Sequence, residues 1–274
     1  MRPRCYSNQD RPFHLGNWPL ERLPRDLAIT AQSTPSLPSK AGTVAGPDSI
    51  LLALAVYQTL FETYLTGDPA SAPAPIPDDL EIRANNVKSH AYFLDIDLAG
   101  CCRLEREDWL SEHAKTNHTH ALVFVQELPR SPDPDGPADA WISGTETAIA
   151  DMRVTEVAAV VSGYIRHLGY AAEGHVIPSG SVDLARLAMR AGVARAENGA
   201  LAAPFLKRGF RLGAVTTTLQ MAADQPLSTH GPLVPDDRAI NDGIDGTKTQ
   251  ADYDDEESRP LHMGRYPMEE IKHV

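Results

Sequence analysis

The stretch TEVAAVVSGYIRHLGY, residues 155–170, decides the fold class of this chain. Its large apolar residues recur at helical spacing, which predicts an amphipathic helix over Thr155–Leu168. Gly169 follows at the point where a residue tolerant of positive φ commonly ends a helix. The residues expected to form the buried stripe are Val157, Val160, Val161, Tyr164, Ile165 and Leu168.

A helix and a strand are predicted downstream of this stretch. The helix has Leu184, Leu187 and Ala188 on its inward side and ends at Gly192. A loop rich in glycine and asparagine leads to Phe210–Leu219, where crowded β-branched residues predict a strand. The order of helix, glycine, helix, glycine and strand indicates a compact fold that contains both element types.

Two helices and a strand are predicted in the first half of the chain. Asp48 is a natural N-cap for a helix over Asp48–Leu65, and a second helix is predicted over Leu80–Leu94. The apolar run Ala121–Leu128 has the length of a central strand. The residues expected to face inward on the first of these helices are Ile50, Leu54, Tyr57, Phe61 and Tyr64. All these elements together predict an α/β (α+β) fold with a central sheet flanked by helices.

Composition disfavours several classes of function. The chain has 274 residues, a net charge of −12 and a pI near 5.2. An acidic surface repels phosphate backbones, so we expect no nucleic-acid partner. The N-terminal residues contain no apolar run typical of a signal peptide or a membrane anchor, so we expect a cytoplasmic protein without membrane contact. The three cysteines, Cys5, Cys101 and Cys102, are too few for a disulfide framework and indicate a reducing compartment.

Two segments far apart in the chain repeat each other. RPFHLGNWPLERL at Arg11–Leu23 and RPLHMGRYPMEEI at Arg259–Ile271 are identical at six of thirteen positions. The residues before the second segment are acidic and poor in apolar side chains, which predicts a linker. A repeat at this spacing predicts a first domain copy over 1–235, a linker over 236–258 and the start of a second, truncated copy over 259–274.

Three motifs of the second half carry a family resemblance. They are YIRHLGY at 164–170, VDLARLAMRAGVARAENGALAAPF at 182–205 and RLGAVTTTLQMAADQP at 211–226, with a looser match, NVKSHAYFLDIDLAGCC, at 86–102. This set resembles the cobalamin-binding core of reductive dehalogenases of the cytoplasmic, respiration-independent type and, more distantly, of epoxyqueuosine reductases. The resemblance implies a nitroreductase-like cobalamin-domain fold. For the full-length family it implies cobalamin and iron–sulfur (4Fe-4S) clusters that remove halogen from organohalides reductively.

The chain departs from the family pattern where the family's chemistry is expected. The clusters need runs of closely spaced cysteines, which this sequence does not contain. The family's proton donor is a tyrosine just ahead of the YIR motif, whereas Asp139–Val154 contains no tyrosine. The family tends to have Gly-Leu-Gly before its Asn-Gly, whereas this chain has Val193–Ala194–Arg195, which indicates a filled cobalamin pocket. The resemblance therefore implies no catalytic residue and no cofactor in this chain.

Three residues are candidates for contact with a cofactor, and each has a structural alternative. They are Asn198, Gly199 and Lys207. Asn198–Gly199 is also a common turn pair, and Lys207 also suits a solvated turn. Tyr164 and Tyr170 belong to the helix motif and are interpreted as packing residues.

Histidines and cysteines raise the possibility of a metal site, which we do not favour. His113, His118 and His120 have the side chains that bind zinc, copper or nickel, but no acidic or cysteine partner stands at ligand spacing. Surface histidines in a polar loop are the favoured interpretation. Cys101 and Cys102 are adjacent, so their side chains diverge, and two small buried residues are favoured over a reactive or metal-binding pair.

Two functions remain open at this point. The favoured one is the non-catalytic N-terminal half of a reductive dehalogenase, a degenerate copy of the cobalamin domain whose partner is a catalytic second copy in the same or a separate chain. The alternative is an active corrinoid-binding subunit completed by a partner chain that carries the iron–sulfur clusters. A reductase acting on tRNA is least favoured because the chain is acidic. Whether this chain is itself an enzyme depends on which of the first two holds.

Overall fold

The structure, a computed structural model, describes residues 20, 23–29, 34–37, 49–110, 117–133, 136, 139–178 and 181–229. The predictions on Asp48, Cys5 and His113 and on the segments 236–258 and 259–274 lie outside the described residues. The helices are α1 (Leu51–Glu62), α2 (Leu80–Phe93), the short 3-10 helix η2 (Arg106–Asp108), α3 (Asp139–Ile142), α4 (Glu146–His167) and α5 (Leu184–Arg190). The strands are β1 (Leu98–Arg103), β2 (His120–Glu127), β3 (Ala172–Val176), β4 (Arg195–Glu197), β5 (Ala200–Ala202) and β6 (Phe210–Thr217).

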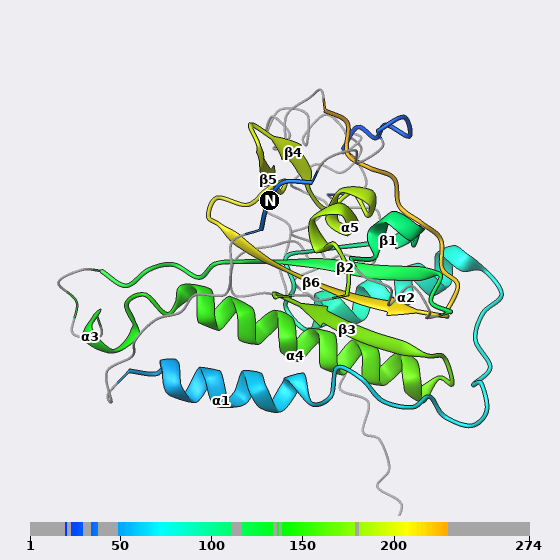
Figure 1. The fold of residues 1–274 in the computed structure, drawn as a ribbon, viewed down its shortest axis with the longest axis horizontal. Coiled ribbons are helices and arrows are strands. Elements are labelled where there is room, and N and C mark those ends of the chain that lie inside the picture. Colours follow the sequence, from blue (N-terminus) through cyan, green and yellow to red (C-terminus); the bar gives the residue numbers. More distant parts are fainter. Residues whose placement is uncertain are drawn as a thin grey trace, which may run out of the picture. The chain divides into compact units, whose positions relative to one another are not determined.

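The main sheet has four antiparallel strands in the order β1-β2-β6-β3 (Figure 1). The predicted strand at Ala121–Leu128 is β2, which pairs with β1 on one side and β6 on the other, so its central place is confirmed. The predicted strand at Phe210–Leu219 is β6, which pairs with β2 and β3. The predicted α/β (α+β) class, a sheet flanked by helices, is therefore confirmed.

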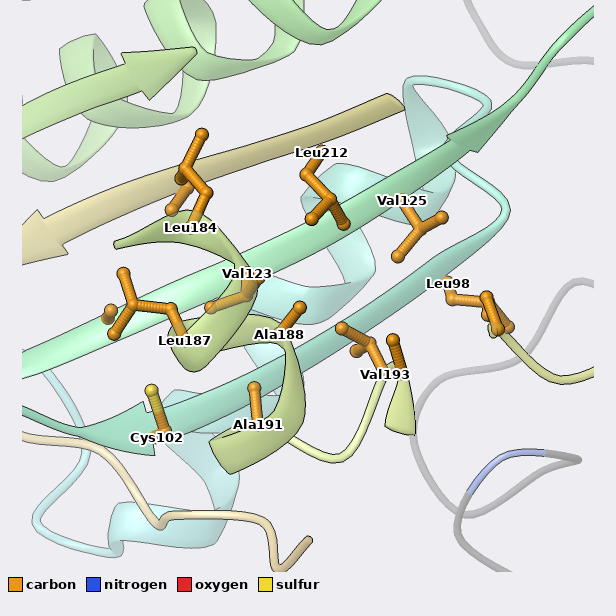
Figure 2. Packing of buried hydrophobic residues seen from close by; sticks show 14 of the residues in the cluster. Leu98, Cys102, Val123, Val125, Leu184, Leu187, Ala188, Ala191, Val193 and Leu212 are labelled. Carbon is orange, nitrogen blue, oxygen red and sulfur yellow. The ribbon is translucent and has the colours of Figure 1, made fainter. Parts of the chain in front are cut away.

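Each face of the sheet packs against its own helices, because neighbouring residues in a strand point to opposite faces. On one face, Leu122 and Phe124 of β2 join α2 and α4. On the other face, Val123 and Val125 join α5 and the loop at Val193 (Figure 2). Figure 1 shows α4 and α1 on one side of the sheet and α5 on the other. All four β2 side chains are fully buried, which places the sheet between two apolar cores.

Helix α4 begins at Glu146, upstream of the predicted start at Thr155. The predicted stripe is confirmed for Val157, Val161 and Ile165, which are at most 1% exposed. It is wrong for Val160, which is 48% exposed. The additional first turns are stabilised by a buried ion pair between Asp151 of α4 and Arg211 of β6, with Nε and Oδ1 3.0 Å apart. A partner sixty residues away leaves no local signal, so the helix start could not be located from periodicity.

Helix α1 faces differently from the prediction. Leu54 and Gln58 are its buried residues, whereas Ile50, Tyr57 and Tyr64 are exposed. The sequence LLALAVYQTLFE is apolar on nearly every side, so periodicity does not determine which side faces the core. The helix predicted over Leu80–Leu94 is confirmed as α2. Its residues Val87 and Ala91 are buried, and the side chain of Asp79 accepts hydrogen bonds at its N-terminus.

Arg25 holds the two ends of the described fold together. Its guanidinium donates to the carbonyls of Leu20, Gly192 and Gln225, at 2.8, 3.1 and 2.6 Å. A main-chain hydrogen bond lies beside this contact, since the backbone amide of Asp26 donates to the Pro226 carbonyl. Gly192 has φ +62°, as predicted for the residue that follows α5. The start and the end of the described chain therefore lie side by side next to α5.

Among the described residues, none of the helices is long and apolar enough to cross a membrane.

Candidate functional site

The loop at Val193–Arg195, where the resemblance implies a cobalamin pocket, is packed against the sheet. Val193 and Ala194 are both 0% exposed, and their amides donate to the carbonyl of Ala188 at 3.0 and 3.2 Å. Gly100 of β1 lies against Ala191 and Val193. A Cβ on Gly100 would lie 2.4 Å from the Ala191 carbonyl oxygen and 2.9 Å from Val193 Cγ1. The backbone of β1 and the Val193 side chain therefore leave no room even for a methyl group between them, and these residues do not fit a corrinoid at this face of the loop. Figure 2 shows Val193 beside Ala191 and Leu98.

Arg195 turns away from that core. Its Nη1 donates to the Ser228 carbonyl at 3.0 Å, and its Nη2 lies 3.5 Å from Glu197 Oε1. These contacts join the start of β4 to the C-terminal end of the described chain. The long side chain therefore serves packing between segments.

Asn198 and Gly199 form the exposed turn of the β4–β5 hairpin. Their φ angles are +52° and +79°, which are typical of a type I′ turn. The predicted turn is confirmed. The proposed contact of these residues with a cofactor stays a prediction, and the turn needs the pair whether or not a ligand binds.

Lys207 lies on a different turn, between β5 and β6, and its side chain is exposed. The backbone amides of Lys207 and Arg208 donate to Glu127 Oε1 at 2.6 and 2.8 Å. The Arg208 guanidinium donates to the other carboxylate oxygen at 2.9 Å. Glu127 is only 8% exposed, so this carboxylate is a buried acceptor that fixes the turn. The role of Lys207 at a cofactor stays a prediction.

The two described cysteines are buried on opposite faces of the sheet. Cys101 belongs to the core with α4, and Cys102 to the core with α5. Burial, together with the nearby Asp108 carboxylate, raises the pKa of the Cys102 thiol well above its ordinary value. A metal ligand must be a thiolate, so this environment opposes metal binding. Within the described ranges, no three His, Cys, Asp or Glu side chains form a group that could hold a metal ion.

The interpretation of His118 and His120 as surface histidines in a polar loop is wrong, because both are partly buried and His120 begins strand β2. His118 Nδ1 lies 2.8 Å from the hydroxyl of Thr216 in β6, whereas His120 Nδ1 lies 2.8 Å from the hydroxyl of Thr119. Burial lowers the pKa of both imidazoles, and Arg103 contributes at His120. Neither histidine is fully solvated. His120 is the first residue of β2, a central strand of the sheet, and His118 lies two residues before it.

Sequence analysis missed a buried histidine that extends this contact. His175 of β3 is 4% exposed, with Nε2 2.8 Å from the Thr216 hydroxyl and Nδ1 3.0 Å from the Ser181 hydroxyl. Burial, and to a smaller extent His118, lowers the pKa of His175 to about 4. The ring of Trp109 meets it edge-on. These residues come from four separate segments, so no motif connects them in the sequence.

The motif residues Tyr164 and Arg166 have structural contacts. Tyr164 stacks on His90 with ring centroids 4.2 Å apart, and its hydroxyl donates to Asn86 Oδ1 at 3.0 Å. The Arg166 guanidinium donates to the carbonyls of Tyr64, Leu65 and Ala172, at 2.8, 3.2 and 3.0 Å. These bonds join the end of α1 to α4 and β3. The YIR motif therefore connects three elements.

The segment in which the family's proton donor is expected forms α3 and the start of α4. Of its polar side chains, Asp151 is committed to the buried ion pair with Arg211. Arg153 is paired with Glu156 at 3.0 Å on the helix surface. The segment therefore contributes two ion pairs and contains no tyrosine whose hydroxyl could donate a proton.

Comparison with known proteins finds a reductive dehalogenase. Neither a protein-family model nor a curated protein matches the chain. A solved structure of the catabolic reductive dehalogenase NpRdhA in complex with 3-bromo-4-hydroxybenzoic acid shares 47% identity, with a TM-score of 0.75. The match covers 100% of this chain and 38% of that chain. A second NpRdhA structure gives the same identity and TM-score and is covered over 39%.

A further solved structure extends the likeness to cobalamin chemistry. It concerns a reductive dehalogenase and B12-dependent dehalogenation, and it matches with 47% identity, a TM-score of 0.73 and coverage of 100% of this chain and 38% of that one. The chain thus spans about two fifths of the length of the structures it matches. The mixed fold described above is consistent with the predicted cobalamin-domain fold. Identity of 47% over the whole of this chain supports the reductive dehalogenase family as its family.

Proposed function

We propose that this chain is the non-catalytic, degenerate copy of the cobalamin-domain fold in a cytoplasmic reductive dehalogenase. In this proposal it packs against a catalytic copy, in the same or a separate chain, that removes halogen from an organohalide with cobalamin and iron–sulfur clusters. The chain itself has a structural role and holds no cofactor. The proposal extends what is known of the matched dehalogenases to a chain that spans about two fifths of their length.

The packing of Val193 carries the proposal. The resemblance implies small residues at this loop, where a bulky planar ligand approaches the backbone. Here Val193 is fully buried, and its Cγ1 lies where a Cβ of Gly100 would intrude. A corrinoid at this face would have to displace a core side chain and a strand. Such a displacement opposes binding because protein interiors are close-packed.

The surroundings of the cysteines and the missing phenol support the same conclusion. Cys101 and Cys102 are buried on opposite faces of the sheet, so they cannot ligate one iron atom together. No tyrosine occurs in Asp139–Val154, ahead of the YIR motif. An active corrinoid-binding subunit, the alternative function, would need another proton donor from its partner.

Anaerobic reconstitution distinguishes the two functions. The purified full chain is incubated with cobalamin, ferrous iron and sulfide, desalted, and measured by absorption spectroscopy beside the matched dehalogenase as a positive control. The degenerate copy is expected to elute without a corrinoid band. A stoichiometric corrinoid band would contradict the proposal and support the active subunit.

A further inference from the structure

The outer side of α1 exposes large apolar side chains that a folded monomer normally buries. Helix α1 contains no charged residue before Glu62. The exposed fractions are 56% for Leu52, 67% for Val56 and 48% for Leu60, which stand four residues apart on one side of the helix. Ile50, Tyr57 and Tyr64 add further exposed area at 43, 56 and 58%. We call these six residues the α1 face.

This face belongs to a helix that is fixed in place. On its inner side, Leu54 and Gln58 are buried. At its C-terminal end, Arg166 donates to the carbonyls of Tyr64 and Leu65. A helix that is apolar on all sides is normally buried on all sides. The exposure of α1 in this chain therefore indicates a surface that another molecule or domain covers.

The apolar surface continues beyond α1. The Ile50 amide donates to the carbonyl of Trp141 in α3, so the two residues are neighbours, and the Trp141 side chain is 57% exposed. Helix α1 itself is about 18 Å long at 1.5 Å per residue. Exposed apolar side chains that follow a helix over this length, with aromatic residues among them, are typical of a protein interface.

The chemistry of the face indicates a protein partner with an apolar surface. Helices that bind lipid surfaces carry lysine and arginine beside their apolar side, whereas α1 has neither and the chain has a net charge of −12. The matched dehalogenase supplies a partner of suitable size, because the larger part of its chain lies outside the part that this chain covers. We propose that the α1 face is the docking surface for the catalytic copy of the cobalamin domain. This inference rests on the function proposed above and names its interface.

A chimera tests the interface. This chain replaces the matching part of the 47%-identical dehalogenase, and the double variant Leu52→Asp/Val56→Asp is compared with Phe93→Asp, an exposed control position in α2. In the chimera, we expect the double variant to lower Tm by about 5 °C or more, because charges would be buried against an apolar partner. In the isolated chain, the same variant is expected to shift Tm by less than about 2 °C, as surface substitutions usually do. The control substitution Phe93→Asp should leave the Tm of both the chimera and the isolated chain unchanged.

Five other outcomes would contradict the inference. Equal Tm values of the parent and variant chimeras would show that the face is free, and an equal loss in the isolated chain would show that it belongs to the chain's own core. An isolated chain that sediments as a dimer, and as a monomer after Leu52→Asp/Val56→Asp, would assign the face to a second copy of this chain. Adsorption of the isolated chain to neutral phosphatidylcholine vesicles, lost in the variant, would assign it to lipid. A parent chimera that does not fold would also count against the pairing of the two copies.

Corrinoid binding by the isolated chain would overturn the proposed function alone, since the chimera comparison still reports on the α1 face.

Discussion

Val193→Ala tests whether the loop at Val193 is core or the wall of a ligand pocket. The side chain is fully buried, and it contacts the strand that contains Gly100. The substitution removes two methyl groups. At about 0.8 kcal/mol for each buried carbon, the lost transfer free energy is about 1.6 kcal/mol.

The cavity adds to this loss. The walls around Val193 include the backbone of Ala191 and of β1, which cannot collapse freely, so the cavity contributes up to about 1 kcal/mol. The free energy of unfolding should therefore fall by about 1.6–2.6 kcal/mol. For a folded region of this size, Tm should fall by roughly 4–10 °C.

Urea and thermal unfolding of the full chain, followed by circular dichroism, measure the loss. Val160→Ala makes the same chemical change at a position that is 48% exposed, and it should alter the free energy of unfolding by less than about 0.5 kcal/mol. A loss at Val193 no larger than at this control would mean that the side chain borders open space. The argument against a corrinoid pocket would then fail.

Three further substitutions test the core and its buried charges. Val161→Asp should be severely destabilising, by several kcal/mol, because it places a carboxylate at a position with 0% exposure, and a Tm near that of the parent would show that α4 is not core. Arg211→Met removes the guanidinium from the buried Asp151 carboxylate and should cost about 3–5 kcal/mol, whereas adding Asp151→Leu should recover part of the loss in urea unfolding. The pKa of His175 is about 4 in the folded chain and 6.5 ordinarily, so the unfolded chain takes up the proton first and stability is lost as pH falls from about 6.5 toward 4. The free energy of unfolding should drop by about 2 kcal/mol more between pH 7 and pH 5 in the parent than in His175→Gln, and equal drops would refute the assignment.

Residues whose signal is local were predicted well. The central strand β2 is a continuous apolar run, and α5 has its inward residues Leu184, Leu187 and Ala188 at helical spacing before Gly192. The Asn198–Gly199 turn follows from the backbone preferences of the two residues. In each case the sequence and the structure agree because the determining interactions lie within a few residues.

Features that depend on distant partners could not be predicted. The strand order β1-β2-β6-β3 and the start of α4 depend on contacts between segments far apart, such as the Asp151–Arg211 ion pair. The His175 contacts with Thr216 and Ser181 likewise join β3, β6 and a loop. For the candidate site, the departure at Val193–Arg195 was visible in the sequence, but its burial against Gly100 required the fold.

The Arg25 contact has a consequence for how this fold can be duplicated. Because the guanidinium binds carbonyls of Leu20, Gly192 and Gln225, the incoming and outgoing chain are neighbours. A domain whose ends adjoin can be joined head to tail with another copy by a short linker, and can be circularly permuted, without threading any strand. The repeated segment at Arg259–Ile271 is the sequence feature that such a tandem arrangement would produce. Adjoining ends therefore provide a topological reason why a second copy of this fold could follow the first along a single polypeptide.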